Sequence, residues 1–202
     1  MSLDKYLLEK NCIISEGYIF QEKEQVKNII NIINNVYLTK KDELKIMEIG
    51  FNAGHSSSLF LYFFKNSKIV SFDLGVHDYI KYGKEFIDLN YPKRHLLLIG
   101  DSTKSVPTYI EEHLNKKFDI IFIDGGHDYE VALSDMENCY KLAHKDTIVI
   151  LDDVTFKDEN IAHWTIGPTR VWNEFLNNNK LIELGRIEYE FGRGMVWGKY
   201  KI

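Results

Sequence analysis

The sequence predicts an α/β fold built around a doubly wound, mostly parallel sheet. Five short apolar runs lack the alternation of inward and outward residues that a half-exposed strand would show. Each run is separated from the next by a segment whose apolar residues recur at helical spacing. Near the end of the sequence, two further strand-like runs flank a Gly-Arg-Gly turn.

The predicted elements follow one another in a regular order. The strand runs span residues 45–49, 68–72, 95–99, 118–123 and 147–151. The helical stripes span residues 22–37, 56–64, 79–87, 106–114, 132–143 and 171–176. Strands separated by helices in this way form right-handed crossovers in a parallel sheet. The last two runs, residues 181–191 and 195–202, predict an antiparallel hairpin.

Length and composition indicate one globular domain, residues 1–202. The chain has 202 residues, of which 45% are hydrophobic and 27% charged, and it contains neither a repeat nor a linker. Within this domain we expect residues 1–40 to form a helical region that covers the site. Residues 154–168 show no periodic pattern, and we expect them to form a lid that is more mobile than the sheet.

Charge and cysteine content restrict the partners. The net charge of -5 gives no general attraction for polyanions, so we expect no nucleic-acid partner. Cys12 and Cys139 are too few for a disulfide framework or a thiolate metal site. No apolar stretch approaches the roughly 18 residues of a membrane helix, and the first residues lack a signal-peptide core. We therefore expect a cytoplasmic protein without a membrane partner.

A carboxylate stands at or near the end of every predicted strand. These residues are Glu48, Asp73, Asp101, Asp124 and the pair Asp152 and Asp153. Asp commonly caps helices and turns, but capping alone does not account for all five strands. Because ligands of open parallel sheets bind beyond the carboxyl ends of the strands, we expect the site at this edge.

The first strand leads into a segment with two glycines, Gly50 and Gly54. Glycines let the backbone approach a ligand closely, and the following helix start offers free N–H groups. Asn52 stands where a dinucleotide fingerprint has its second glycine, which disfavours an NAD oxidoreductase. Asp73 lies at the end of the second strand, where a carboxylate can accept hydrogen bonds from ribose hydroxyls. The combination predicts a nucleoside-type ligand.

The sequence resembles class I S-adenosylmethionine-dependent methyltransferases. The likeness rests on the segments MEIGFNAGHSS, SFDLG, IGDSTKSVP and FDIIFIDGGHDYEVALSDMENCYKLAHKDTIVILDDV. It is strongest to the group with Asp-Gly-x-His-x-Tyr after the fourth strand (methyltransferase family 24-like), and it extends to catechol-type O-methyltransferases. It covers about residue 24 to the end of the sequence. It implies a Rossmann-like sheet of seven strands in the order 3-2-1-4-5-7-6.

The resemblance also implies how the cofactor S-adenosylmethionine would be held. The residues that would surround its methionine part are Glu48, Gly50, Asn52, Gly54 and Ser56. Asp73 would hold the ribose, Asp101 and Ser102 would edge the adenine, and Asp124 would also contact the cofactor.

The resemblance places the fourth and fifth strands side by side, so Asp124, Asp152 and Asp153 should converge. Three such carboxylates repel one another unless a cation binds or some are protonated. Oxygen ligands suit Mg²⁺, which in the catechol-type enzymes occupies the matching positions. Asp124 is therefore expected to take part in catalysis as well.

His127 follows Asp124 by three residues and is expected as a catalytic base or as an acceptor contact. The remaining histidines outside the expected lid have no evident partner and are expected at the surface or at caps: His55, His77, His95, His113 and His144.

The predicted function is metal-assisted O-methylation of a small hydroxylated molecule of sugar or natural-product type. Several alternatives stay open: a metal-independent N- or O-methyltransferase, another enzyme on the same fold, or a non-catalytic nucleoside-binding protein. The aromatic N-terminal residues Tyr6, Tyr18 and Phe20 could cover the site or pair with a second subunit in a homo-oligomer.

Overall fold

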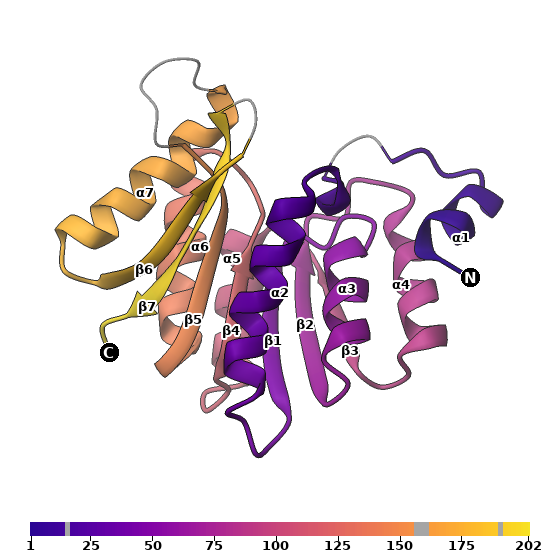
Figure 1. Cartoon of the computed structure of the whole chain (residues 1–202), viewed down its shortest axis with the longest axis horizontal. Coiled ribbons are helices and arrows are strands. Elements are labelled where there is room, and N and C mark those ends of the chain that lie inside the picture. Colours follow the sequence, from indigo (N-terminus) through magenta and orange to yellow (C-terminus); the bar gives the residue numbers. More distant parts are fainter. Residues whose placement is uncertain (15–16, 156–161, 190–191) are drawn as a thin grey trace. The chain divides into compact units, whose positions relative to one another are not determined.

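The computed structural model describes residues 1–14, 17–155, 162–189 and 192–202. Its seven strands follow the order β3-β2-β1-β4-β5-β7-β6 (Figure 1). β7 pairs antiparallel with both β5 and β6, whereas the pairs β1–β2, β2–β3 and β4–β5 are parallel. These findings confirm the predicted α/β class, the strand order and the C-terminal hairpin. Two compact units, Met1–Gly100 and Asp101–Ile202, make up the chain.

Three parallel strands form the centre of the first unit: β1 (Leu44–Ile49), β2 (Ser67–Asp73) and β3 (His95–Ile99). β1 pairs with β2 up to Ile49 and Phe72, so the carboxyl ends of both strands lie at one edge. Five of the six side chains of β1 are buried, which explains why its sequence shows no alternation.

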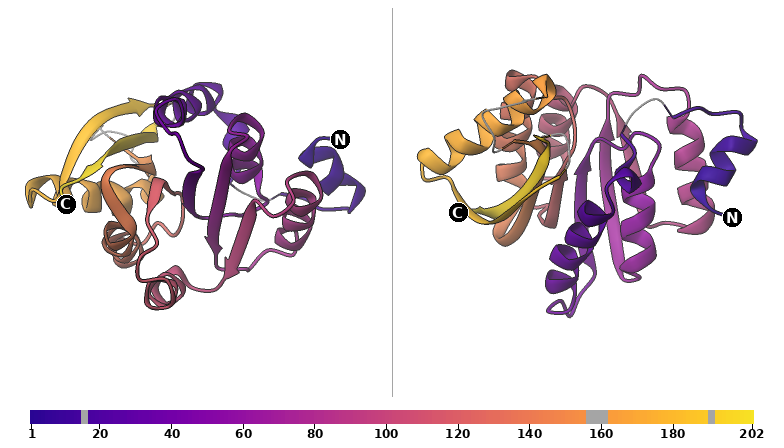
Figure 2. Two further views of the ribbon diagram at one scale, coloured as in Figure 1. Left: turned by 90° about the horizontal axis from the view of Figure 1, so that it is seen from below. Right: turned by 45° about the horizontal axis from the view of Figure 1, so that its top comes forward.

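The helices of the first unit are α1 (Leu3–Glu9), the 3₁₀ turn η1 (Ile19–Gln21), α2 (Lys23–Tyr37), α3 (His55–Phe63) and α4 (Ile80–Asn90). α3 packs against β2 and α4 packs against β3. Both views of Figure 2 show α1 beside α4, and the two helices are in contact. The N-terminal segment is therefore attached to the outer helix of this unit.

The second unit contains β4 (Phe118–Ile123), β5 (Ala143–Val154), β6 (Leu181–Glu188) and β7 (Gly194–Tyr200). All six residues of β4 and the last eight of β5 are buried, as expected for central strands. This continuous burial accounts for the two apolar runs from which both strands were predicted.

Three helices pack in sequence in the second unit: α5 (Ser102–Glu112), α6 (Tyr129–Leu142) and α7 (Ile166–Asn177). The short turn η2 (His163–Thr165) precedes α7, so the last part of the expected lid is helical. Residues 156–161 of that lid, including Lys157, lie outside the described residues. Among the described helices, none combines the length and apolar character needed to cross a bilayer.

Among the described residues of the second unit, one carboxyl group is buried without the hydrogen bonds that would stabilise its charge. Asp135 on α6 is fully buried, and neither of its carboxylate oxygens has a hydrogen-bond partner of ordinary geometry among the described residues. Burial raises the pKa of Asp135 to about 6 from 3.8; the Ser102 hydroxyl opposes this rise and the charge of Asp101 adds to it. An uncompensated buried carboxylate destabilises the folded state whenever it is ionised.

We expect Asp135→Asn to raise stability at neutral pH. Because the pKa of Asp135 is higher in the folded chain, the folded state holds the extra proton between about pH 4 and 6, and the wild type loses stability as pH rises through that window. Relative to wild type, the variant should gain about 1–3 kcal/mol between pH 4 and pH 7.5 in denaturant unfolding. Glu137→Gln, on an exposed position of the same helix, should show no such gain. Parallel pH curves for Asp135→Asn and wild type would contradict the assignment.

Candidate active site

The segment after β1, residues 50–54, is called the glycine loop here. Gly50, Asn52 and Gly54 all have positive φ angles, of 93°, 49° and 86°. The value at Asn52 is uncommon for a residue with a side chain, and such strain persists where surrounding contacts hold it. At Gly54 a Cβ would meet the Phe51 ring at 2.7 Å, so this position requires glycine. The loop thus has one specific backbone conformation.

Asp73 at the end of β2 fixes the glycine loop. Its Oδ2 accepts a hydrogen bond from the Asn52 backbone N–H at 2.7 Å. Its Oδ1 accepts one from the Gly75 N–H at 2.8 Å. Each carboxylate oxygen keeps a second lone pair, so the same group can still accept hydrogen bonds from a ligand. This geometry brings the predicted residues Asn52 and Asp73 together.

Beneath the loop, the predicted residue Glu48 is fully buried among serines. Ser56 donates to its Oε1, and Ser57 and Ser71 donate to its Oε2 at 2.6 and 2.5 Å. Burial raises the pKa of Glu48, and the three hydroxyls act in the opposite direction. The Glu48 carboxylate and these three serine hydroxyls join β1, β2 and the start of α3 to one another.

His95 on β3 completes this buried network. Its Nε2 lies 2.9 Å from Ser71 Oγ and 3.3 Å from Ser57 Oγ. Both serine hydroxyls already donate to Glu48, so His95 must be the donor, which defines the Nε2–H tautomer. Burial lowers the pKa of His95 to about 3, with a smaller contribution from Lys84. The expectation of surface or capping positions is therefore wrong for His95, as it is for His55, which is only 3% exposed.

In the second unit, Asp101 caps α5. Its Oδ1 accepts hydrogen bonds from the Thr103 N–H at 3.0 Å and from the Thr103 hydroxyl at 2.7 Å, which lower the pKa of Asp101. Ser102 is the first residue of the helix. Both predicted adenine contacts therefore lie at a helix start, where unpaired N–H groups are available.

The carboxyl ends of β4 and β5 carry an acidic cluster of three residues. Ligand atoms of Asp124, His127 and Asp153 all lie within 4.8 Å of one another. His127 Nε2 is 3.0 Å from Asp153 Oδ2, and Arg193 Nε is 3.5 Å from Asp153 Oδ1. Asp153 has a positive φ of 53°, a strained backbone at the centre of the cluster.

Asp152 is placed differently from its neighbour. It is 4% exposed, and its Oδ1 accepts a hydrogen bond from the Asp153 N–H at 2.9 Å. It lines a narrow hollow of about 10 Å³ together with Asp124 and His127, which leaves room for about one water-sized group. The cluster of described residues thus contains two of the three predicted metal ligands, and the predicted base stands with them.

Two residues that the sequence did not single out support the segment around His127. A Cβ on Gly167 would lie 2.1 Å from the His127 carbonyl oxygen, so α7 approaches this backbone closely. Tyr129 donates to Glu174 at 2.7 Å, and Arg170 lies 4.0 Å from the centre of the Tyr129 ring. Tyr129 could have been predicted from its place in the Asp-Gly-x-His-x-Tyr motif, whereas no sequence pattern indicates the role of Gly167.

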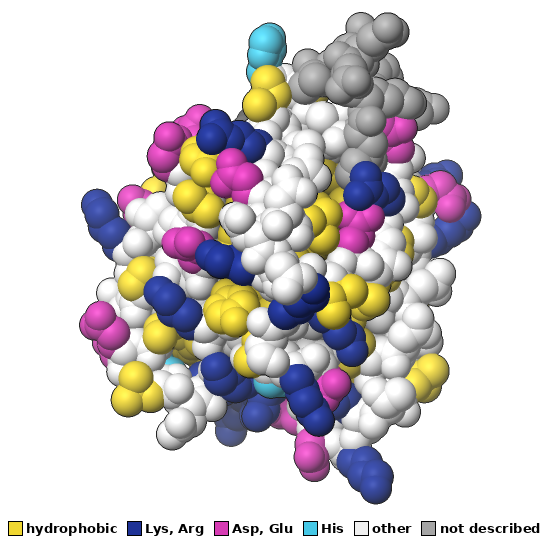
Figure 3. All heavy atoms as spheres, turned by 90° about the vertical axis from the view of Figure 1, so that its left-hand side faces the viewer, with side chains coloured by type: hydrophobic (Ala, Val, Ile, Leu, Met, Phe, Trp, Pro, Cys, Tyr) yellow, Lys and Arg dark blue, Asp and Glu magenta, His cyan; other side chains and the backbone are white. Residues whose placement is uncertain are grey.

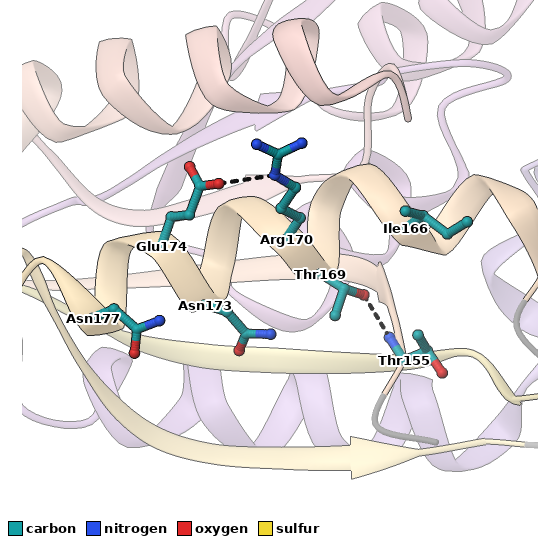
Figure 4. Close-up of a pocket in the computed structure, with 7 residues that line it drawn as sticks. All are labelled: Thr155, Ile166, Thr169, Arg170, Asn173, Glu174 and Asn177. Atoms are coloured by element: carbon teal, nitrogen blue, oxygen red, sulfur yellow. Dashed lines mark hydrogen bonds and ion pairs between the residues drawn. The ribbon is translucent and has the colours of Figure 1, made fainter. Parts of the chain in front are cut away.

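An open groove of about 420 Å³ runs along α7. Figure 4 shows that Asn173, Asn177, Thr169 and Thr155 lie on one side of this helix, while the Arg170–Glu174 ion pair lies on the other. Thr155 donates its N–H to Thr169 Oγ1 at 2.9 Å, which joins the end of β5 to α7. The groove is therefore bounded by the helix that supports the His127 segment.

Sequence comparison assigns the family. The chain matches the family described as "Methyltransferase domain" over residues 47–154, just over half of its 202 residues, and belongs to this family. An uncharacterized protein of Acanthamoeba polyphaga mimivirus is 29% identical over 132 residues, which cover 61% of this chain. The match spans only 58% of that relative's length.

Solved structures share the fold. An O-methyltransferase from Bacillus cereus in complex with S-adenosylhomocysteine (SAH) has a TM-score of 0.73 at 19% identity, covering 98% of this chain and 90% of that one. The TDP-rhamnose 3'-O-methyltransferase of calicheamicin biosynthesis has a TM-score of 0.67 at 19% identity, covering 99% and 92%. The family match and the shared fold confirm the resemblance to class I methyltransferases.

The hydrogen bonds of His95 with Ser57 and Ser71 predict the protonation state of its ring. Its ring should remain neutral, as the Nε2–H tautomer, down to about pH 3, because burial opposes protonation. ¹⁵N chemical shifts of the ring recorded between pH 8 and 4 should therefore stay constant, and His95→Gln identifies the signals. A ring that titrates near pH 6.5 would contradict the network.

Proposed function

We propose that the protein transfers a methyl group from S-adenosylmethionine to an oxygen of a small hydroxylated molecule. The observation that carries this proposal is the hydrogen bond from Asn52 N–H to Asp73. It places a carboxylate suited to ribose hydroxyls beside a glycine loop, inside the segment that matches the methyltransferase family. A related structure holds SAH, which is the product of this cofactor.

In this proposal each part of the first unit has one task. The free acceptor positions of Asp73 take the ribose hydroxyls. The glycine loop and the start of α3 meet the methionine part, where helix N–H groups favour its carboxylate. The main contribution to rate is alignment of the methyl carbon with the acceptor oxygen, since orientation supplies about 7–11 kcal/mol.

The acidic cluster has donors that fit a divalent cation. Asp124 and Asp153 would hold the ion, with Asp152 lining the adjoining hollow. The imidazole of His127 as a third donor widens the choice beyond Mg²⁺ to ions such as Mn²⁺ or Zn²⁺. When bound, the ion would lower the pKa of the acceptor hydroxyl.

His127 Nε2 can either donate a hydrogen bond to Asp153 or bind a cation, but not both. Without a cation, Nε2–H donates to Asp153 and Nδ1 is the atom that takes the acceptor proton, with Asp153 orienting the ring. If Nε2 binds a cation, it cannot donate to Asp153. Arg193 beside Asp153 favours the metal-independent methyltransferase as a second candidate, because it already supplies a positive charge.

The acceptor is proposed to be a sugar or natural-product hydroxyl. One structural relative carries TDP-rhamnose 3'-O-methyltransferase in its name, and the proposal extends this acceptor class to the present chain. The described part of the face formed by α7 and the hairpin carries Lys and Arg interspersed with Asp and Glu (Figure 3). This mixture of charges supports a small-molecule acceptor better than a polyanion.

Cofactor binding tests the proposal directly. SAH should bind in isothermal titration calorimetry, and NADH should not. Asp73→Ala removes the ribose acceptor and the loop contact, so the Kd for SAH should rise by roughly 10²-fold. Asp78→Ala, an exposed carboxylate five residues further, is the matched control and should bind like wild type. Binding of NADH without binding of SAH would refute the proposed cofactor.

Cation binding decides between the two candidate mechanisms. If the cluster holds an ion, Mn²⁺ should bind in the absence of any acceptor, measured by electron paramagnetic resonance. Asp153→Asn should abolish that binding, while Asp128→Asn, an exposed neighbour, should leave it intact. His127→Ala should lower SAH formation from a panel of hydroxylated acceptors by roughly 10²–10⁴-fold if His127 is the base. Full turnover in excess chelator would establish the metal-independent mechanism.

A further inference from the structure

The N-terminal segment contacts the first unit at two places. The described residues 1–14 and 17–21 are called the N-terminal strap here. Its first contact lies on α4, where Leu7 is buried and the rings of Tyr6 and Phe86 lie 5.6 Å apart. Lys10 pairs with Glu85 at 3.5 Å on the same helix. This contact anchors α1 on α4.

The second contact lies at the start of α3, directly after the glycine loop. Asp4 Oδ1 is 2.8 Å from Nε2 of His55, the first residue of α3. Tyr18 donates to the other oxygen of Asp4 at 3.2 Å, and its ring meets the His55 ring edge-on at 4.8 Å. Phe20 packs edge-on against His55 at 5.9 Å. Three strap residues therefore enclose the His55 ring.

Gly17 brings the strap into contact with the loop. A Cβ at this position would lie 2.1 Å from Asn52 Nδ2, and the positive φ of 65° favours glycine there. Asn52 is the residue whose N–H donates to Asp73. The strap thus touches the loop at Asn52 and the start of α3 at His55, on either side of Gly54.

The protonation state of His55 follows from its partners. The Asp4 carboxylate can only accept, so His55 Nε2 carries the hydrogen. The other ring nitrogen, Nδ1, is buried and has no hydrogen-bond partner among the described residues. A second proton would place an N–H at that buried position without an acceptor, which costs free energy. The closed strap therefore requires a neutral ring.

We propose that the N-terminal strap holds the glycine loop in its binding conformation through the Asp4–His55 pair, and that protonation of His55 releases it. Asp4 and His55 are positioning residues, since they act on the cofactor through the loop. The inference rests on the proposed function in one respect, namely that the loop binds S-adenosylmethionine.

The direction of the pH effect follows from the surroundings of His55. Burial lowers the pKa of His55, and the facing carboxylate of Asp4 only partly offsets this. Tyr18 also faces the ring and is uncharged in this range, since burial raises its pKa. The closed strap binds fewer protons than the open one, so closure is favoured above the ordinary imidazole pKa of about 6.5 and lost as pH falls below it.

Two measurements on the 202-residue protein test the proposal. The first is the Kd for SAH by calorimetry at pH 7.5 and 5.5. Wild type should bind more weakly at pH 5.5, and Asp4→Ala should bind about tenfold more weakly than wild type at pH 7.5. His55→Gln keeps an N–H donor and removes the titrating ring, so its ratio of the two Kd values should be closer to one. Glu9→Gln changes an exposed carboxylate at the end of α1 and is the matched control, with the pH ratio of wild type.

The second measurement is hydrogen exchange of the Asn52–Gly54 amides without ligand. These amides should exchange faster in Asp4→Ala, and to a lesser degree in Tyr18→Phe, than in wild type or Glu9→Gln. Wild-type values for Asp4→Ala and His55→Gln in both measurements would overturn the strap while leaving the proposed cofactor intact. If the wild type itself does not bind SAH, the proposed function fails, and the exchange rates still decide whether the strap holds the loop.

Discussion

The hydrogen bonds that satisfy the buried Glu48 carboxylate are the interaction on which the first unit depends. An ionised carboxylate without partners at a fully buried position would cost several kcal/mol, and three serine hydroxyls reduce that cost. Those serines come from the start of α3 and from β2, so satisfying one charge fixes three elements relative to one another. The glycine loop connects β1 to α3, so its position is fixed by the same hydrogen bonds.

The sequence was sufficient for the fold because the relevant signals are local. Buried strands such as β4 show mostly apolar runs without alternation, and helices such as α2 show a clear stripe. The motif residues Asp124 and His127 are three positions apart after one strand, so their proximity could be predicted. The same reasoning found Asp73, because the ends of β1 and β2 meet at one edge.

Interactions between distant residues could not be predicted in this way. Asp4 and His55 are 51 positions apart, and no periodicity connects them. The sequence pattern does not distinguish Asp152 from Asp153 as the partner of His127. In the structure His127 lies beside Asp153, whose backbone has a positive φ that no sequence pattern shows. Asp135 has the helical spacing of a core position, but only the packing of α6 shows that its charge is uncompensated.

The close approach of Gly167 to the His127 carbonyl has a consequence for engineering. Together with the Tyr129–Glu174 hydrogen bond, it ties the beginning and the middle of α7 to the segment after β4. These two stretches are about forty positions apart in the sequence, yet they pack directly against each other. A chimera that imports α7 from a relative must import residues 125–129 with it, because a larger residue in place of Gly167 would displace the backbone that carries His127.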